Sequence, residues 1–395
     1  MRYQLAADTF GSEEREAILR VINNECYTLG IHVKQFESMF AEKFESKYAV
    51  MVNSGSSANL IAVAALFYHK KQSFHPGDEV IVPAISWATT YYPLHQYGLK
   101  LKFVDIDLET LNINPDLLET ALTPKTKMIV AVNVLGNPCA LETLKTFCNK
   151  HNLILFEDNC ESMGAMLNNR YCGTFGHVGT FSTFFSHHIS TMEGGIIVTN
   201  DEELYELCLS LRSHGWTRTI PNNAQIYRPK DDDFFEAYRF IFPGYNVRPI
   251  EMLGAIGIEQ LKKLDQMIEQ RRENAALFTK LFANDKRFII QRENGMSSWF
   301  SFTVILNPTL NWSRTAILAA LKQADIEHRI ITGGNFLRHD VIQHINHETV
   351  GEIKNANIAH DYGFFVGNHP RNLSKEINYF HSVISRVTEK ETEID

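Results

Sequence analysis

Between Asp78 and Asn200 the chain alternates short, nearly continuous apolar runs with segments of helical periodicity. The apolar runs are rich in valine, isoleucine and phenylalanine, and they cover Glu79–Pro83, Lys102–Asp105, Met128–Val134, Leu153–Asp158, Gly179–Phe185 and Gly195–Thr199. Strands that are buried on both faces have this composition. The alternation predicts an open α/β sheet of mostly parallel strands flanked by helices, with its ligand crevice at the carboxyl ends of the strands.

The pattern changes after about Pro249. A long helix is expected from Ile250 through Arg272, and strand–helix units such as Trp299–Ile305 follow it. With 395 residues the chain is long enough for two hydrophobic cores. We therefore expect a large cofactor-binding domain at residues 1–248 and a smaller α+β domain at residues 249–395.

Composition narrows the class of protein. The formal net charge is -8 and no basic tract stands out, which argues against nucleic acid as the partner. No apolar run is long enough to span a bilayer and the first residues lack a signal-peptide core, so no membrane association and a cytoplasmic location are expected. The six cysteines form no C-x-C or C-x-x-C pair, which argues against a disulfide framework and against an iron–sulfur cluster.

A serine-rich stretch, Asn53–Leu60, precedes an apolar helical run. Free N–H groups, the hydroxyls of Ser56 and Ser57 and the positive end of the helix dipole would together form an anion cradle. Taken alone, an ordinary serine-rich helix cap explains this stretch better than a binding site does.

Two further residues follow predicted strands at the same edge of the sheet. Asp158 ends the run Leu153–Asp158, and a carboxylate at a buried strand end can keep a pyridine nitrogen protonated. The alternative is a helix cap or a solvated loop acid, but the spacing favours a functional role, because Asp158 and Ser182 lie at the ends of successive predicted strands at the same sheet edge. Trp87 follows Glu79–Pro83 and could stack on a flat heteroaromatic ring, although a single tryptophan is more often a core residue.

The segment Thr180–Gly195 resembles the cofactor-lysine segment of sugar-modifying aminotransferases, which reads roughly F-S-F-x-x-x-K-x-x-x-x-G-E-G-G. His187 stands at the lysine position. Ordered matches from Cys26–Gly30 to Glu327–Arg329 make nearly the whole chain similar to the DegT/DnrJ/EryC1/StrS family of fold type I. The resemblance implies a fold type I aminotransferase fold. Histidine cannot tether the cofactor covalently, but it can carry a proton near neutral pH.

The resemblance also implies roles by position. The phosphate of pyridoxal 5′-phosphate or pyridoxamine 5′-phosphate, bound non-covalently, would be held by the hydroxyls of Ser56, Ser57 and Ser182. Trp87 would stack on the pyridine ring and Asp158 would pair with its nitrogen. Asn246 would reach the phosphate from the neighbouring subunit, which implies a homodimer with shared active sites. Glu161 stands near the ring hydroxyl, where the aminotransferases usually have glutamine.

The segments around His187 and Arg329–Arg338 are similar to one branch of the family, the 3-dehydratases of nucleotide-activated 4-keto-6-deoxy sugars. The scattered cysteines favour the kind without an iron–sulfur cluster, which recharges its cofactor with L-glutamate. The expected substrate is a GDP-linked 4-keto-6-deoxy sugar. CDP- and dTDP-linked sugars stay open, because no motif for reading the base is recognisable.

Within this hypothesis His187 removes a proton and later returns it, which one group near neutral pH can do. His214 is a second candidate for the proton path, and Arg329 could bind the α-carboxylate of glutamate or a substrate phosphate. His187 and His188 are adjacent on a predicted strand and point to opposite faces, so no metal site is expected. The alternatives are an aminotransferase with its lysine elsewhere, or a non-catalytic regulator.

Overall fold

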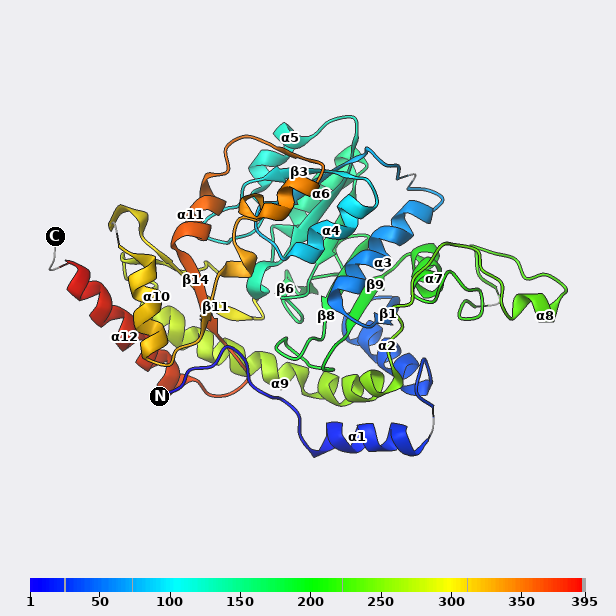
Figure 1. The fold of residues 1–395 in the computed structure, drawn as a ribbon, viewed down its shortest axis with the longest axis horizontal. Coiled ribbons are helices and arrows are strands. Elements are labelled where there is room, and N and C mark those ends of the chain that lie inside the picture. The colour runs from blue at the N-terminus through cyan, green and yellow to red at the C-terminus, as the bar shows by residue number, and fades with distance from the viewer. Residues whose placement is uncertain (25, 73, 222, 311, 393–395) are drawn as a thin grey trace.

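The computed structural model describes residues 1–24, 26–72, 74–221, 223–310 and 312–392. Its large sheet has eight strands in the order β1-β9-β8-β5-β4-β2-β3-β13 (Figure 1). Their bounds are Tyr48–Val52 (β1), Glu79–Pro83 (β2), Lys100–Val104 (β3), Thr126–Val132 (β4), Ile154–Asp158 (β5), Val178–Ser182 (β8), Gly195–Thr199 (β9) and His347–Thr349 (β13). Each of the six predicted apolar runs overlaps one of these strands, and the runs at β3, β4 and β8 begin one or two residues late.

Strand β9 pairs antiparallel with β8 and with β1, while the other neighbours in the sheet run parallel. The prediction of a mostly parallel α/β sheet is therefore confirmed. A parallel connection needs a crossover, usually a helix. The link between β8 and β9, residues 183–194, contains no helix and stays at the carboxyl edge of β8. This link carries His187, so the reversal of β9 keeps that histidine beside the predicted crevice.

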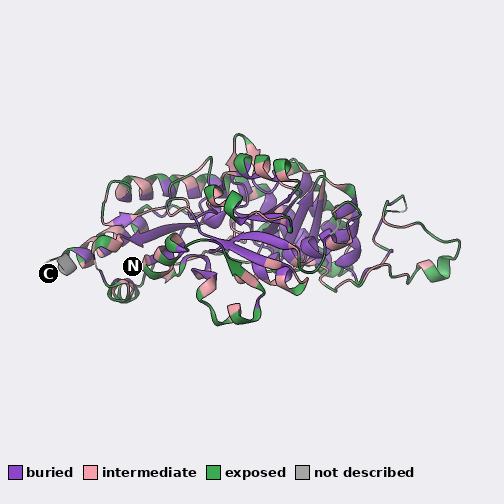
Figure 2. Ribbon diagram, turned by 90° about the horizontal axis from the view of Figure 1, so that it is seen from above, coloured by how far each residue is buried: buried purple, intermediate pink, exposed green. Residues whose placement is uncertain are grey.

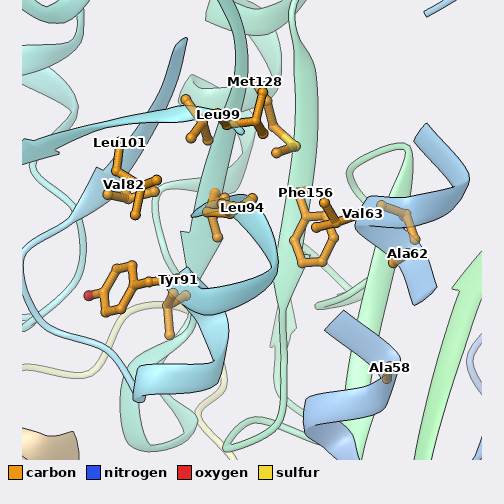
Figure 3. Close-up of a cluster of buried hydrophobic side chains, with 14 of the residues drawn as sticks. Ala58, Ala62, Val63, Val82, Tyr91, Leu94, Leu99, Leu101, Met128 and Phe156 are labelled. Atoms are coloured by element: carbon orange, nitrogen blue, oxygen red, sulfur yellow. The ribbon is translucent and has the colours of Figure 1, made fainter. Parts of the chain in front are cut away.

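Successive residues of the central strands enter different hydrophobic clusters, because side chains alternate across a sheet. Val80 and Val82 belong to a cluster with α3 (Gly55–Tyr68), α4 (Ala88–Gln96) and α7 (Glu202–Leu211), whereas Ile81 belongs to one with α5 (Leu118–Ala121) and α6 (Leu141–His151). Figure 3 shows part of the first cluster, where side chains of α3 and α4 gather with those of strands such as β2, β4 and β5. Burial on both faces explains why these strands read as continuous apolar runs.

A second sheet of four antiparallel strands has the order β10-β11-β14-β12. Its strands are Phe288–Ile289 (β10), Ser301–Leu306 (β11), His328–Arg329 (β12) and Gly363–Gly367 (β14). The helices α10 (Arg314–Gln323), α11 (Lys354–Tyr362) and α12 (Ser374–Thr392) follow in the C-terminal part, and a small hairpin joins β6 (Met166–Leu167) to β7 (Arg170–Tyr171). The smaller α+β unit therefore has its own hydrophobic core.

Helix α9 runs from Glu251 to Phe282, ten residues beyond the predicted end at Arg272, and connects the two cores (Figure 1). Its first half packs on α1 (Ser12–Asn23) and α2 (Ile31–Lys43), and its last turns join the smaller core. Tyr3 packs in that smaller core too, and β13 joins the large sheet. The domain division at residue 248 stays a prediction, and these segments cross it.

Between α7 and α9 the chain leaves the body of the molecule as an extended arm, residues 216–240, that carries the short helix α8 (Asp233–Glu236) (Figures 1 and 2). Its aromatic side chains are largely exposed, and Phe234 has 93% of its surface exposed. Within the residues that the structure describes, no helix combines the length and the apolar character needed to cross a membrane.

The start of α9 is fixed to the start of α2 by one buried carboxylate. Glu251 accepts hydrogen bonds from the backbone N–H groups of Gly30 (2.6 Å), His32 (2.5 Å) and Val33 (3.3 Å). These are the first-turn donors of α2, which have no partner within their own helix, and the negative charge also suits the positive end of the helix dipole. Glu251 thereby holds α2, and β1 that follows it, against the long helix.

Replacing this carboxylate should destabilise the fold without touching the predicted site. We expect Glu251→Gln to lower the free energy of unfolding by about 2–3 kcal/mol, because an amide cannot accept all three hydrogen bonds and loses the charge. Urea denaturation followed by circular dichroism measures the change. Glu16→Gln, an exposed position on α1, is the matched control and should leave the unfolding midpoint in place. Equal midpoints for the two variants would contradict this account of α2.

Candidate active site

The carboxyl ends of β5 and β8 and the first turns of α3 and α4 meet at one edge of the large sheet, and Asp158 lies at their centre. Its Oδ2 accepts hydrogen bonds from Asn59 Nδ2 of α3 (2.9 Å) and from Thr90 Oγ1 of α4 (2.7 Å). Its Oδ1 accepts one from the backbone N–H of Cys160 (3.1 Å). Asp158 is buried, and its two oxygens accept three hydrogen bonds, so the carboxyl group is fixed at the end of β5, where it could pair with a pyridine nitrogen.

The start of α3 has the shape expected of a phosphate cradle. Ser54 caps the helix, because its Oγ accepts a hydrogen bond from the backbone N–H of Ser57 (3.1 Å). A Cβ on Gly55 would lie 2.6 Å from the Cβ of Ser182, so only glycine lets the helix start come this close to the end of β8. First-turn amides and the Ser182 hydroxyl are thus brought together, which fits a bound phosphate.

The two other predicted serines lie in the same turn. The Ser56 hydroxyl donates to Thr89 Oγ1 of α4 at 2.8 Å, and the Ser57 hydroxyl lies 3.0 Å from Ser54 Oγ. Trp87 directly precedes α4 and leaves 59% of its surface exposed. The structure therefore brings Ser56, Ser57 and Ser182 together at one edge of the large sheet. The exposed indole of Trp87 lies at the start of α4, the helix that carries Thr89.

His187 lies on the β8–β9 link, at the same edge. Its Nδ1 is 2.5 Å from the carbonyl oxygen of Cys160, two residues after Asp158, so Nδ1 carries the proton in the neutral ring and Nε2 is left as the base. Phe184 and Phe300 pack edge-on against the imidazole. Nε2 has no hydrogen-bond partner in the part of the chain that the structure describes.

Burial is the main cause that lowers the pKa of His187 to about 4, and the hydrogen bond that Nδ1 donates to the Cys160 carbonyl acts in the opposite direction. The charge of Arg271 lowers the pKa further, and that of Asp158 raises it. His187 is therefore neutral at physiological pH and able to accept a proton. The negative charge of a bound phosphate would move this pKa back towards neutrality. His188 lies deeper, with Nε2 3.1 Å from the Ser298 carbonyl oxygen, and has the surroundings of a structural histidine.

Glu161 lies on the loop after Asp158 and accepts hydrogen bonds at Oε2 from the Leu135 N–H (3.0 Å) and from the Thr332 hydroxyl (3.3 Å). Burial raises its pKa to about 7, and the nearby charge of Asp158 raises it further. Leu135 and Thr332 both have positive φ, +52° and +44°. The structure thus places Glu161 beside Asp158, in contact with a loop from each half of the chain.

Three predicted residues lie apart from this cluster. Asn246 is exposed and its side-chain oxygen accepts a hydrogen bond from Arg248 Nε (3.0 Å). His214 is also exposed and lies beside Asn246, because the backbone N–H of His214 donates to the carbonyl of Tyr245, the residue that precedes Asn246 (2.6 Å). Arg329 is exposed on β12, where its Nη1 donates to the His328 carbonyl (2.9 Å). None of the three contacts His187 among the described residues.

Sequence reasoning missed the residues that hold Asp158. Asn59 is the clearest case, because it is a polar residue in the otherwise apolar run of α3, and a buried amide must find a partner. The backbone of Cys160, whose N–H donates to Asp158 and whose carbonyl accepts from His187, could not be predicted, because a backbone contact depends on the path of the chain. Across the described ranges, no group of three histidine, cysteine, aspartate or glutamate side chains is arranged to hold a metal ion.

Comparison with known proteins gives the family. The model of the DegT/DnrJ/EryC1/StrS aminotransferase family matches residues 8–384, and the chain belongs to that family. It is 50% identical over 388 residues to the GDP-4-keto-6-deoxy-D-mannose 3-dehydratase of Yersinia pseudotuberculosis, with 98% of this chain and 99% of that protein covered. The predicted fold type I architecture is confirmed by solved structures.

Two of these structures are informative about ligands. A mutant of GDP-4-keto-6-deoxymannose-3-dehydratase with histidine replaced by asparagine, solved with bound GDP-perosamine, has a TM-score of 0.95 at 49% identity and covers 97% of this chain and 100% of that one. The same enzyme with a trapped PLP-glutamate geminal diamine has the same TM-score, identity and coverage. Those proteins therefore hold a GDP-sugar, pyridoxal phosphate (PLP) and glutamate.

The close contact at Gly55 predicts how the cradle can be damaged. We expect Gly55→Ala to weaken the binding of pyridoxal phosphate at least about tenfold, because the new methyl group displaces Ser182. Absorbance titration of the apoprotein measures the dissociation constant. Gly11→Ala at the start of α1 is the control, because Gly11 has φ -110° and a Cβ there meets only the ends of the flexible side chains of Glu13, Glu14 and Lys263. If Gly55→Ala binds pyridoxal phosphate as tightly as the control, this edge is not the phosphate site.

Proposed function

We propose that this chain is a pyridoxal-phosphate-dependent enzyme that removes the C3 hydroxyl group from GDP-4-keto-6-deoxy-D-mannose, with L-glutamate regenerating the amine form of the cofactor. The observation that carries the proposal is His187, a neutral base held at the cofactor edge where the family's tethering lysine would stand. The relatives with this activity and their ligands support it. The reaction would serve the biosynthesis of the dideoxysugar colitose.

The cofactor would be held by this chain's own groups and not by a covalent bond. Bound pyridoxamine phosphate supplies an amine that condenses with the C4 ketone and a ring that accepts the electrons of an adjacent carbanion. Asp158 would pair with the ring nitrogen, because three hydrogen bonds hold its carboxyl group in place at the end of β5. The first turn of α3 and Ser182 bind the phosphate, and Trp87 covers the ring.

His187 would be the residue that removes a proton during the reaction and later returns it. Nε2 takes it, because the Cys160 carbonyl engages Nδ1 and fixes the tautomer. The imidazolium then protonates the C3 oxygen as it departs as water, and a group with a depressed pKa gives up a proton readily. The balance is a sugar lighter by one oxygen atom, with glutamate converted to 2-oxoglutarate and ammonia. Arg329 would bind the glutamate carboxylate or a substrate phosphate, and His214 would contribute to the proton path.

The first test is mass spectrometry of a reaction that contains the protein, pyridoxal phosphate, L-glutamate and the GDP-4-keto-6-deoxy sugar. A sugar nucleotide lighter by one oxygen, together with 2-oxoglutarate, is the expected result. An amino sugar would instead mean that transamination persists and that the mechanism is wrong. Without any change in the GDP-sugar, the CDP- and dTDP-linked sugars are tested next, and failure with all three favours the regulatory alternative.

Variants at His187 separate proton transfer from binding. We expect His187→Asn to bind pyridoxal phosphate within about threefold of the unmodified protein but to lose at least about 100-fold in turnover, because asparagine cannot accept the proton. His188→Asn is the comparison variant. Because His188 is a buried structural residue, we expect this variant to lose thermal stability but to keep its turnover per folded molecule. A fully active His187→Asn protein would show that another residue is the base.

We propose further that the protein is a homodimer with shared active sites. The arm at residues 216–240 extends away from the body and exposes Phe234, Tyr238 and Phe240, a surface that one chain alone leaves uncovered. Asn246 lies near the base of this arm and points to Arg248, not to the serines of its own cradle. In this proposal a second copy of the chain covers the arm, and Asn246 reaches the active site of that second copy.

Complementation between two inactive variants tests the shared sites. Coexpressed His187→Asn and Asn246→Ala chains should regain roughly a quarter of full activity, because half of randomly paired dimers are mixed and each mixed dimer has one intact site. His187→Asn with Asp158→Asn is the control, since these two residues belong to the same site and no mixed dimer has a complete one. Equal activity from both pairs would overturn the proposal that Asn246 serves the partner.

A further inference from the structure

Arg271 is a buried arginine of α9 that lies where this helix passes from the core of the large sheet to the smaller core. Its Nη1 donates to the carbonyl oxygens of Phe300 (3.1 Å) and Asn368. Within the described ranges no carboxylate lies within ion-pair distance of the guanidinium, and its Nε is buried without a hydrogen-bond partner. Buried charges are ordinarily paired, so this positive charge acts on its surroundings without a counterion.

One of the two carbonyls belongs to the residue whose ring packs on the proposed base. The Phe300 ring lies edge-on to the imidazole of His187, with the ring centroids 5.1 Å apart and an interplanar angle of 75°. The backbone N–H of Phe300 donates to the Leu135 carbonyl at 3.0 Å, and its carbonyl accepts from Arg271. Arg271 therefore supplies one of the two backbone contacts that hold this ring against His187.

Arg271 also acts on His187 through its charge. The charged and titratable residues around the imidazole are Asp158 at the end of β5, Cys160 on the following loop, His188 beside it in the chain and Arg271 from α9. Burial is the largest cause of the low pKa of His187, the charge of Arg271 adds to it, and the charge of Asp158 opposes it. Burial lowers the pKa of Arg271 only to about 9, so the guanidinium is charged at neutral pH.

We propose that Arg271 is a positioning residue for His187, which holds the Phe300 ring against the imidazole and places a positive charge that disfavours the imidazolium. The proposal rests on the proposed function, in which His187 takes a proton and returns it to the departing C3 oxygen. A neighbouring positive charge keeps the imidazole neutral at rest and makes the imidazolium a stronger acid, so that the proton is passed on. Arg271 acts through His187 and needs no contact with the substrate or the cofactor.

The test follows the titration of His187 itself, in the full chain without added cofactor. Histidine labelled with carbon-13 at Cε1 gives one NMR signal for each ring, and the signal that disappears in His187→Asn is that of His187. The pH is varied from about 4 to 8, around the ordinary range of histidine. We expect Arg271→Met to raise the midpoint of this signal by at least about half a pH unit, because the charge that disfavours the imidazolium is gone.

The neighbouring arginine provides the matched control. Arg272 Nε donates to the Ser297 carbonyl at 2.9 Å, in the same segment before β11, so Arg272→Met also removes a contact between an arginine and this backbone. We expect this control to lose stability and to leave the His187 midpoint within about 0.2 pH unit of its original value. Arg271→Gln is a second variant, which keeps a donor for one carbonyl but has no charge, and it should shift the midpoint in the same direction as Arg271→Met.

Turnover gives an independent measurement. For Arg271→Met we expect kcat to fall about tenfold, with KM for the GDP-sugar and the dissociation constant of pyridoxal phosphate within about threefold, because the change affects proton transfer and not binding. The acid limb of the pH profile of kcat/KM should move to higher pH, since His187 must be neutral to accept the proton.

Two results would overturn the proposal. The first is an unchanged His187 midpoint in both Arg271→Met and Arg271→Gln, and the second is an equal shift in Arg272→Met. Either would mean that Arg271 only joins α9 to the segment before β11. If the unmodified protein dehydrates none of the sugar nucleotides, the proposed function fails, and the NMR titration still decides whether Arg271 acts on His187.

Discussion

The carboxylate of Asp158 is the interaction on which the site depends, because it joins three elements that are distant in the sequence. Asn59 comes from α3, Thr90 from α4 and the Cys160 N–H from the loop after β5. A buried charge is tolerated only when such donors surround it, so each of them is needed for stability as well as for function. The same hydrogen bonds set the distance between the anion cradle and the ring-binding position.

Exchange of lysine for histidine changes what this framework can do. A lysine would bind the cofactor covalently, whereas in the proposed function His187 would leave the cofactor free and act as a base whose tautomer the Cys160 carbonyl selects. Burial keeps the imidazole neutral and makes its conjugate acid strong. A base that is neutral at rest and gives its proton back easily suits the loss of a poor leaving group such as hydroxide. The chemistry therefore follows from one side chain and one carbonyl.

Much of the architecture could be predicted from the sequence. Strands buried on both faces appear as continuous apolar runs, and helices are recognised by the helical spacing of their apolar residues. Strands β2 and β9 were predicted with the bounds that the structure has. The end of α9 was placed ten residues early, because the helix changes partners along its length and its apolar pattern changes with them. Strand β13 had no signal, since three residues join β3 from far along the chain.

Some site residues could likewise be placed from the sequence, and others could not. Asp158, Ser182 and Trp87 could be placed at one edge because they follow predicted strands, whereas the contacts of His187 and Glu161 depend on the backbone path. The loop at Leu135 shows why. The Phe300 N–H donates to the Leu135 carbonyl and the Ser298 N–H to the Gly136 carbonyl, both at 3.0 Å. The segment before β11 thus fixes a left-handed turn that in turn positions Glu161. Because the Thr332 hydroxyl reaches the same carboxyl group from the segment after β12, segments next to the smaller sheet and the loop after β5 are held together at Glu161.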